Sequence, residues 1–230
     1  GLMCGKVLGD LGAEVIVVEP PSGHPARTIG PFYKDEVHPE KSLFWFAYNT
    51  SKKGMTLDIT HPAGQQVLKA LVRHVDIVVE SYAPGYLDAL GLGYEALSKI
   101  KPEVIFTSIT PFGQTGPRRN WKGTDVTLQA RSGLQYLLGD PDRAPVRISV
   151  PMIATKAGVE AASSSLFALF HRNRTGEGQR VDVSIQAVGI WQMMNASSFP
   201  KHHGTNQARA GDRYNAGFGN ARAILVCADG

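Results

Sequence analysis

The stretch HPAGQQVLKALVRHVDIVVE, residues 61–80, decides the fold. Pro62 can open a helix, because the first helical position does not need the N–H that proline lacks. Apolar residues then repeat at helical spacing as far as Val75, and the apolar run 76–80 follows as a strand. A helix that leads into a continuously apolar strand is typical of parallel sheets that are covered on both faces.

The same alternation of helices and strands extends in both directions from this stretch. Upstream, GLMCGKVLGDLGAEVIVVE predicts a helix that ends at Gly12, followed by a strand over 14–19. A long loop from Pro20 to about Leu43 follows, and then a basic turn at 52–54 before a short strand that ends at 57–58. Downstream, the pattern predicts helices over 95–100, 125–138 and 158–171 and strands over 103–109 and 180–185. The chain is therefore expected to be an α/β protein with a parallel sheet.

Composition limits the class of protein. The chain has 230 residues, 43% of them hydrophobic and 19% charged, which is typical of a globular protein. Its apolar runs are shorter than the roughly 18 residues that cross a bilayer, and its first residues do not form a secretory signal. We therefore expect a cytoplasmic enzyme with no membrane partner. Cys4 and Cys227 stand at opposite ends without ligand spacing, so both are expected to be buried thiols, with no disulfide framework and no metal site.

The net charge of +4 favours an anionic ligand. The basic residues are scattered, which argues against a nucleic-acid partner and favours a small molecule that carries phosphate. The glycines at 1, 5, 9 and 12 do not form G-x-G-x-x-G, and no P-loop follows an early strand, so binding of NAD or ATP by a common motif is not supported.

Six segments in order match one family. They are CGKVLGDLGAEVIVVEPP (4–21), NTSKKGMTLDITHPAGQQVLKALV (49–72), DIVVESYAPGYLDALGLGYEAL (76–97), FTSITPFGQTGP (106–117), KGTDVTLQARSGL (122–134) and HRNRTGEGQRVDVSIQ (171–186). On these segments the chain resembles the class III CoA-transferases of the CaiB/BaiF type, the family of formyl-CoA transferase, carnitine CoA-transferase and α-methylacyl-CoA racemase.

The resemblance implies the domain organisation and the partners. Residues 1–199 would form a Rossmann-like large domain that binds CoA, and 200–230 would begin a linker or a small domain. Two subunits would thread through each other as an interlocked dimer, either of identical chains or with a homologous catalytic subunit. Family members are longer, and the chain starts within a helical pattern and ends at what looks like a hairpin turn at 228–230, so truncation at both ends is expected.

The resemblance also implies where CoA, as substrate, would bind. It places Arg27 and Lys122 near the phosphates, and Leu57, Ser81, Tyr82 and Ile185 around the adenine and ribose. The family usually has Asn-Phe where this chain has Ser81-Tyr82. The alternative for each of these residues is an ordinary surface charge or a core residue.

The stretch VRISVPMIATKAGVEAASSSLFALF, residues 146–170, lacks the group on which the family's chemistry depends. In class III transferases an Asp attacks the acyl-CoA thioester, which gives a mixed anhydride and free CoA thiolate. By the family pattern Ala154 occupies the position of that Asp, and Gly158 would open a helix whose free N–H groups stabilise the oxyanion. Thr155 is adjacent, but no His or Asp is close in sequence to take the proton of its hydroxyl.

The racemase branch of the family uses a His followed by an Asp, which here become Thr124 and Asp125. Asp125 is expected to cap its helix rather than to act in catalysis. Three hypotheses remain. A homologous subunit or domain supplies the catalytic Asp; or the protein is a racemase-like or other acyl-CoA enzyme that uses Asp125 and Glu160 or groups elsewhere; or it is a non-catalytic CoA-binding scaffold.

Overall fold

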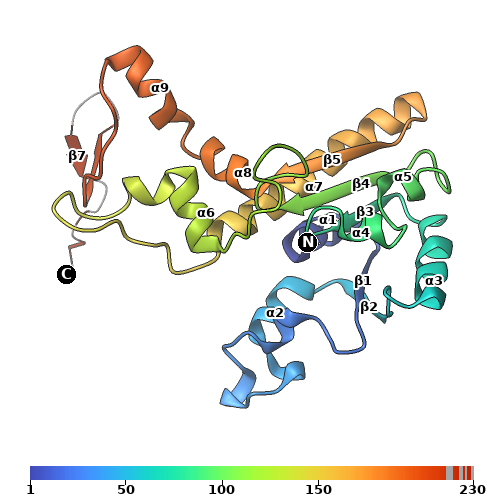
Figure 1. Cartoon of the computed structure of the whole chain (residues 1–230). Helices are drawn as coiled ribbons and strands as arrows, with labels where there is room; N and C mark the ends of the chain where they lie inside the picture. The colour runs from blue at the N-terminus through green and yellow to red at the C-terminus, as the bar shows by residue number, and fades with distance from the viewer. Residues whose placement is uncertain (216–219, 223–224, 226, 229–230) are drawn as a thin grey trace.

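The computed structural model describes residues 1–215, 220–222, 225 and 227–228. Figure 1 shows helices packed around parallel strands, with α9 and the β6–β7 pair at one end of the molecule. The strands are β1 Val15–Glu19, β2 Lys52–Thr56, β3 Ile77–Glu80, β4 Ile105–Thr110, β5 Gln179–Ser184, β6 Arg213–Asn215 and β7 Asn220–Arg222. The helices are α1 Leu2–Asp10, α2 Leu43–Asn49, α3 Pro62–Val72, α4 Tyr86–Ala89, α5 Tyr94–Leu97, α6 Asp125–Ser132, α7 Met152–Thr175, α8 Ile185–Trp191 and α9 Met194–His203.

The α/β class and the parallel strands predicted from the sequence are confirmed. The described strands form two separate parallel ladders rather than one sheet: β1 pairs with β2, and β4 lies between β3 and β5. Among the described strands no backbone ladder joins the two. Side chains join them instead, since Val15 of β1 and Ile77 and Val79 of β3 pack into one apolar cluster with α1.

One face of the β3–β4–β5 sheet is covered by α1 and α7 at very close range. The face of α7 that packs here carries Ala157, Gly158, Ala161, Ala162 and Ser165, all of them buried. A Cβ atom on Gly158 would lie 2.6 Å from the Cβ of Met3 in α1. Small side chains are therefore what allows these two helices to approach each other.

The opposite face of the sheet is covered by α3, α4 and α5. A second apolar cluster forms there around Val72, Leu92, Leu97 and Phe106, each at most 3% exposed. All six residues of β4 are buried. The sheet thus lies between two layers, as the apolar strands predicted, and its loops at the carboxyl ends of the strands are left accessible.

Three predicted boundaries are wrong: the end of the helix that starts at 125, the turn at 52–54, and the start of the long helix α7. The expected helix over 125–138 ends at Ser132, because Gly133 takes a left-handed conformation (φ 88°) and a 3-10 turn follows. The basic turn expected at 52–54 is part of β2, since the preceding Ser51 makes the turn (φ 62°). The Lys52 ammonium donates to the carbonyls of Leu2 and Tyr48, and burial lowers its pKa to about 8.

The expected helix over 158–171 instead spans Met152–Thr175. Gly158 does not open it, because the glycine is needed inside the helix for the contact with α1. Only one cysteine is buried as expected. Cys4 of α1 is buried against α7, whereas Cys227 is exposed. The turn expected at 228–230 falls mostly outside the described residues. None of the described helices is long and apolar enough to cross a membrane.

Candidate functional site

The loops that follow β1, β3 and β4 all leave from the carboxyl ends of parallel strands. These loops cover residues 20–42, 81–85 and 111–124. Ligands of open α/β sheets bind at such ends, where the polar groups of neighbouring loops converge. The candidate site is therefore this edge of the molecule, together with the first turns of α6 and α7.

The first turns of α6 and α7 are joined by Asp125. Its Oδ1 accepts a hydrogen bond from the backbone N–H of Ala154 (3.1 Å), and its Oδ2 accepts one from Nε2 of Gln129 (2.5 Å). The prediction that Asp125 caps its own helix is wrong, because Thr124 is the N-cap and exchanges hydrogen bonds with Thr127. The carboxylate of Asp125 instead lies against the start of the neighbouring helix.

Ala154 is the third residue of α7 and is exposed. The sequence interpretation put this residue before the helix and expected free N–H groups near Gly158. The helix begins six residues earlier than that, so the N–H groups of its first turn lie at 152–154. Two of them are already paired, because the Met152 N–H donates to the Val150 carbonyl (2.7 Å) and the Ala154 N–H donates to Asp125.

Thr155 and Glu160, the other catalytic candidates, both lie on α7, and their roles in catalysis stay predictions. The Thr155 hydroxyl donates to the Pro151 carbonyl (2.8 Å) and lies 3.2 Å from the Tyr48 hydroxyl, which can donate to it. Neither partner is a base that could take a proton from Thr155. Glu160 is exposed on α7, about 9 Å further along the helix axis than Ala154.

Arg27 is the residue whose surroundings differ most from the expected phosphate contact. Its Nε and Nη2 donate to the two carboxylate oxygens of Glu19 at 2.7 and 2.8 Å, and its Nη1 donates to Glu40 at 2.9 Å. The guanidinium also lies 4.2 Å from the centre of the Trp45 ring. These contacts hold the 20–42 loop on the end of β1, and the role of Arg27 in phosphate binding stays a prediction.

The other expected CoA contacts are spread along the same edge. Leu57 follows β2 and donates its N–H to the carbonyl of Glu19 (2.8 Å), and Ile185 is the half-buried first residue of α8. Ser81 and Tyr82 follow β3 directly; the Tyr82 ring is exposed and stacks on Tyr86 with ring centres 4.9 Å apart. Lys122 is exposed in the loop before α6. Their roles in binding stay predictions.

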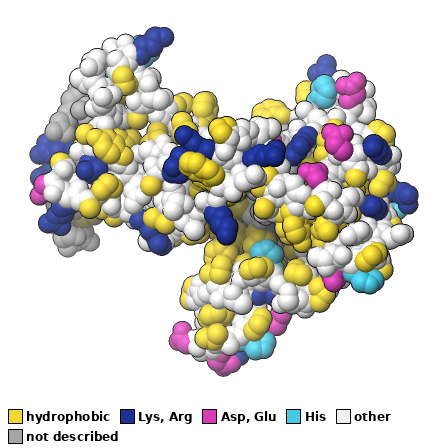
Figure 2. Space-filling model, in the orientation of Figure 1, with side chains coloured by type: hydrophobic (Ala, Val, Ile, Leu, Met, Phe, Trp, Pro, Cys, Tyr) yellow, Lys and Arg dark blue, Asp and Glu magenta, His cyan; other side chains and the backbone are white. Residues whose placement is uncertain are grey.

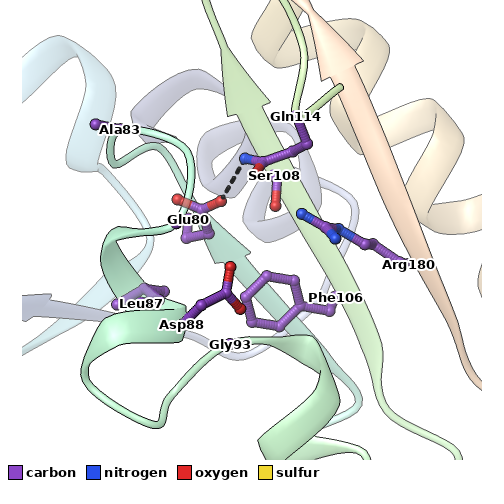
Figure 3. A pocket seen from close by; sticks show the side chains of 10 residues that line it. Glu80, Ala83, Leu87, Asp88, Gly93, Phe106, Ser108, Gln114 and Arg180 are labelled. Carbon is purple, nitrogen blue, oxygen red and sulfur yellow. Dashed lines mark hydrogen bonds between the residues drawn. The ribbon is translucent and has the colours of Figure 1, made fainter. Parts of the chain in front are cut away.

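A small polar pocket next to Tyr82 was missed by sequence reasoning. Figure 3 shows Glu80, Ser108, Gln114 and Arg180 converging on it from β3, β4, the 111–124 loop and β5. The Glu80 carboxylate accepts hydrogen bonds from the Tyr82 N–H (2.7 Å) and from Gln114 Nε2 (3.4 Å). The pocket has room for roughly one water molecule.

Burial raises the pKa of Glu80, and it prevails over the opposite influence of the Ser108 hydroxyl and the Tyr82 N–H. A polar residue at the end of an apolar strand was the available signal for this pocket, but the strand DIVVE was interpreted only as a core element. Within the described residues, no group of three or more His, Cys, Asp or Glu side chains is placed to hold a metal ion.

The fold and the edge of loops define the class: an α/β protein with a candidate ligand site at the carboxyl ends of parallel strands, beside the start of a long helix. The family model for CoA-transferase family III matches residues 1–230. The chain belongs to CoA-transferase family III.

Individual relatives agree with this assignment. The chain is 39% identical over 230 residues to the succinyl-CoA:(R)-benzylsuccinate CoA-transferase subunit BbsE of Thauera aromatica. This match covers all of this chain and 55% of that protein. It is 40% identical over 211 residues to the succinyl-CoA–D-citramalate CoA-transferase of Chloroflexus aurantiacus, covering 91% of this chain and 51% of the relative.

A crystal structure of a CaiB/BaiF family protein from Brucella suis has the same fold. It superposes with a TM-score of 0.86 at 34% identity, over 92% of this chain and 56% of that protein. The chain therefore spans about half the length of the relatives it matches.

Proposed function

We propose that this chain forms the CoA-binding part of a class III CoA-transferase that moves CoA between carboxylic acids, and that a homologous subunit or domain supplies the catalytic Asp. An interlocked dimer, of identical chains or with a homologous catalytic partner, would bring the two parts together. A relative that is itself named as a subunit supports such a division between chains.

The observation that carries this proposal is Ala154 at the start of α7. Its methyl group cannot attack a thioester, and the adjacent Thr155 hydroxyl donates to a backbone carbonyl. The Asp125 carboxylate already accepts two N–H groups, which lowers its nucleophilicity. Within the described residues, this junction therefore holds no side chain prepared to accept an acyl group.

The expected reaction assigns a different part to each chain. The Asp of the partner attacks the thioester carbonyl, the C–S bond breaks, and CoA leaves as the thiolate. The carboxylate of the second acid then attacks the Asp carbonyl of the anhydride, the first acid leaves as its carboxylate, and the Asp carries the second acyl group. The thiolate attacks that acyl carbonyl, the bond from the acyl carbon to the Asp oxygen breaks, and the new thioester leaves the Asp as a free carboxylate. In this chain the N-terminus of α7, with its partial positive charge, favours the oxyanion that forms during each attack.

Purified full-length protein, alone and mixed with its homologous subunit, tests the division of labour. Alone, it should bind CoA but should neither exchange CoA between acids nor give an acyl-enzyme adduct that hydroxylamine traps. The mixture should do both, with the adduct on the partner. A trapped adduct on the protein alone would refute the interpretation of Ala154.

The converse experiment restores the carboxylate with Ala154→Asp. Because Asp125 accepts the N–H of residue 154, the new carboxylate would lie near an existing one, and repulsion between the two would raise its pKa and weaken it as a nucleophile. We therefore expect more trapped adduct from the double variant Ala154→Asp with Asp125→Asn. Ala154→Asn, of matched size but neutral, is the control and should give none.

Failure of both Asp variants to give an adduct, with CoA binding intact, would show that more than the nucleophile is missing from this site.

A second candidate function has a specific observation in its favour. The Asp125 carboxylate lies at the same junction as Ala154, so a racemase-like or other acyl-CoA enzyme with altered acid/base groups could use it to take the α-proton of an acyl-CoA. Deuterium uptake at the α-carbon in D2O, lost in Asp125→Asn, would support that function. CoA binding with neither exchange nor deuterium uptake, even in the presence of the partner, would support a non-catalytic scaffold.

A further inference from the structure

Two arginines and two aromatic rings form a cluster at the edge where the strands end. The guanidinium carbon of Arg131 lies 4.6 Å from the centre of the Trp121 ring and 5.8 Å from that of Phe112, and the guanidinium carbon of Arg118 lies 5.4 Å from Trp121. Phe112 meets Trp121 edge to face, with ring centres 6.0 Å apart. We call these four residues the arginine–tryptophan cluster.

The cations of this cluster have no acidic partner in the part of the chain that the structure describes. The ion pairs among the described residues involve other side chains, and none includes Arg118, Arg119, Lys122 or Arg131. The Asp nearest in sequence, Asp125, accepts from Ala154 and Gln129 instead. The positive charge here is therefore available to a ligand, whereas that of Arg27 is matched by Glu19 and Glu40.

The cluster is fixed to the ends of β4 and β5. Phe112, Arg118 and Trp121 belong to the loop that follows β4, and Arg131 is in the last turn of α6. Gln186 is the second residue of α8. It donates its side-chain N–H to the Arg131 carbonyl (3.0 Å) and its backbone N–H to the Pro111 carbonyl (3.0 Å). In Figure 2, dark-blue Lys and Arg side chains gather across the middle of this face.

We propose that the arginine–tryptophan cluster binds the phosphate groups of CoA. This inference rests on the proposed function, since it names the part of the chain that holds the anionic end of the same substrate. A guanidinium that lies over an aromatic ring keeps the N–H groups along its edge free, and that edge matches two oxygens of a phosphate. Trp121 orders both guanidinium groups before the ligand arrives, which reduces the entropy lost on binding.

A carboxylate from another protein chain would also complement this charge. Phosphate is favoured because the cluster lies at the carboxyl ends of the parallel strands, next to Lys122, and Arg27, the other expected phosphate contact, is already paired. A phosphate monoester carries about 1.5 to 2 negative charges at pH 7, more than one carboxylate, and so matches two unpaired guanidinium groups better.

The test is isothermal titration of the full-length protein with CoA, 3′-dephospho-CoA and phosphate-free pantetheine. The double variant Arg118→Gln, Arg131→Gln should raise the Kd for CoA by roughly tenfold to a hundredfold. The rise should be smaller for dephospho-CoA if the 3′-phosphate makes the contact, and equal for the two if the diphosphate makes it. Binding of pantetheine should not change, and the Kd for CoA should depend less on ionic strength than in the wild type.

Arg174→Gln is the control for the loss of an arginine elsewhere. Arg174 is exposed and lies 5.4 Å from the Phe170 ring at the far end of α7, so this change removes one charge, half of that lost in the double variant, and the same kind of ring contact away from the site. Its Kd for CoA should equal that of the wild type. Arg118→Lys, Arg131→Lys should recover only part of the affinity, because lysine keeps the charge without the planar edge.

Two results would overturn the inference. One is an unchanged Kd for CoA in the double glutamine variant while the wild type binds CoA; the other is an equal loss of pantetheine binding, which would indicate a general change of structure. A wild-type protein that does not bind CoA would instead refute the proposed function, and this inference with it.

Discussion

Glu19 and Glu80 occupy the same position in different strands. Each is the last residue of a parallel strand, β1 or β3, and each is nearly buried, at 6% and 8% exposed. The Glu19 carboxylate accepts hydrogen bonds from Nε and Nη2 of Arg27, and these hydrogen bonds lower the pKa of Glu19 despite its burial. Glu80 accepts from the Tyr82 N–H and the Gln114 amide and has no bidentate arginine among the described residues, and burial raises its pKa. The loop beyond each strand, rather than the strand, decides whether the carboxylate is neutralised within the fold.

Removing Arg27 is the strongest way to break this comparison. Arg27→Met keeps much of the packing on Trp45 but leaves the Glu19 carboxylate buried without its cation. We expect the free energy of unfolding to fall by about 3 kcal/mol, measured by urea denaturation. Glu40→Gln removes only the outer partner, which is 70% exposed, and should cost less than about 0.5 kcal/mol. Equal costs for the two variants would mean that the Glu19–Arg27 pair adds nothing to stability.

The pH dependence of stability should have opposite signs at the two carboxylates. Because the folded state lowers the pKa of Glu19, its stabilising contribution is present above the ordinary value of 4.5 and is lost as the pH falls through the lowered value. Because the folded state raises the pKa of Glu80, the folded protein keeps the proton more strongly, and stability falls as the pH rises from 4.5 through the raised value.

Denaturation curves of Glu19→Gln and Glu80→Gln over about pH 3 to 7 check these signs. Relative to the wild type, Glu19→Gln should lose the decline on the acid side, and Glu80→Gln should lose the decline on the neutral side. Parallel profiles for the two variants would show that their surroundings do not differ as described.

The smallest expected effect concerns Thr110, on the same side of β4 as Ser108. Its hydroxyl is fully buried and has no hydrogen-bond partner within the described part of the chain. Thr110→Val replaces this hydroxyl with a methyl group of similar size, so stability should stay the same or rise by up to about 1 kcal/mol. A loss of more than about 1 kcal/mol on thermal unfolding would reveal a partner for this hydroxyl.

Local patterns were enough to predict the layers of the fold. Pro62 and the helical spacing after it predicted α3, and the apolar runs predicted β3, β4 and β5 within a few residues. The start of α7 was misplaced because Gly158 was interpreted as a boundary, although Ala157, Ala161 and Ser165 recur at helical spacing on either side of it. That spacing was the signal for one continuous helix.

The contacts of the site could not be predicted in the same way. The pairing of Arg27 with Glu19 depends on how a long loop folds back over eight residues, and Trp121 lies ten residues from Arg131 in sequence. In each pair irregular backbone separates the two residues, so no helix or strand repeat in the sequence indicates that these side chains meet. The position of Ala154 came from resemblance to the family, and only the structure revealed the Asp125 contact to its N–H.

The hydrogen bond between Tyr48 and Thr155 connects two parts of the molecule that are remote along the chain. Tyr48 belongs to α2, which follows directly on the loop that Arg27 holds to Glu19, and Thr155 is one residue from Ala154. Disorder in the 20–42 loop would therefore loosen the start of α7 at the candidate site without altering any residue of that helix. Substitutions around Arg27 should then resemble substitutions at the candidate site itself.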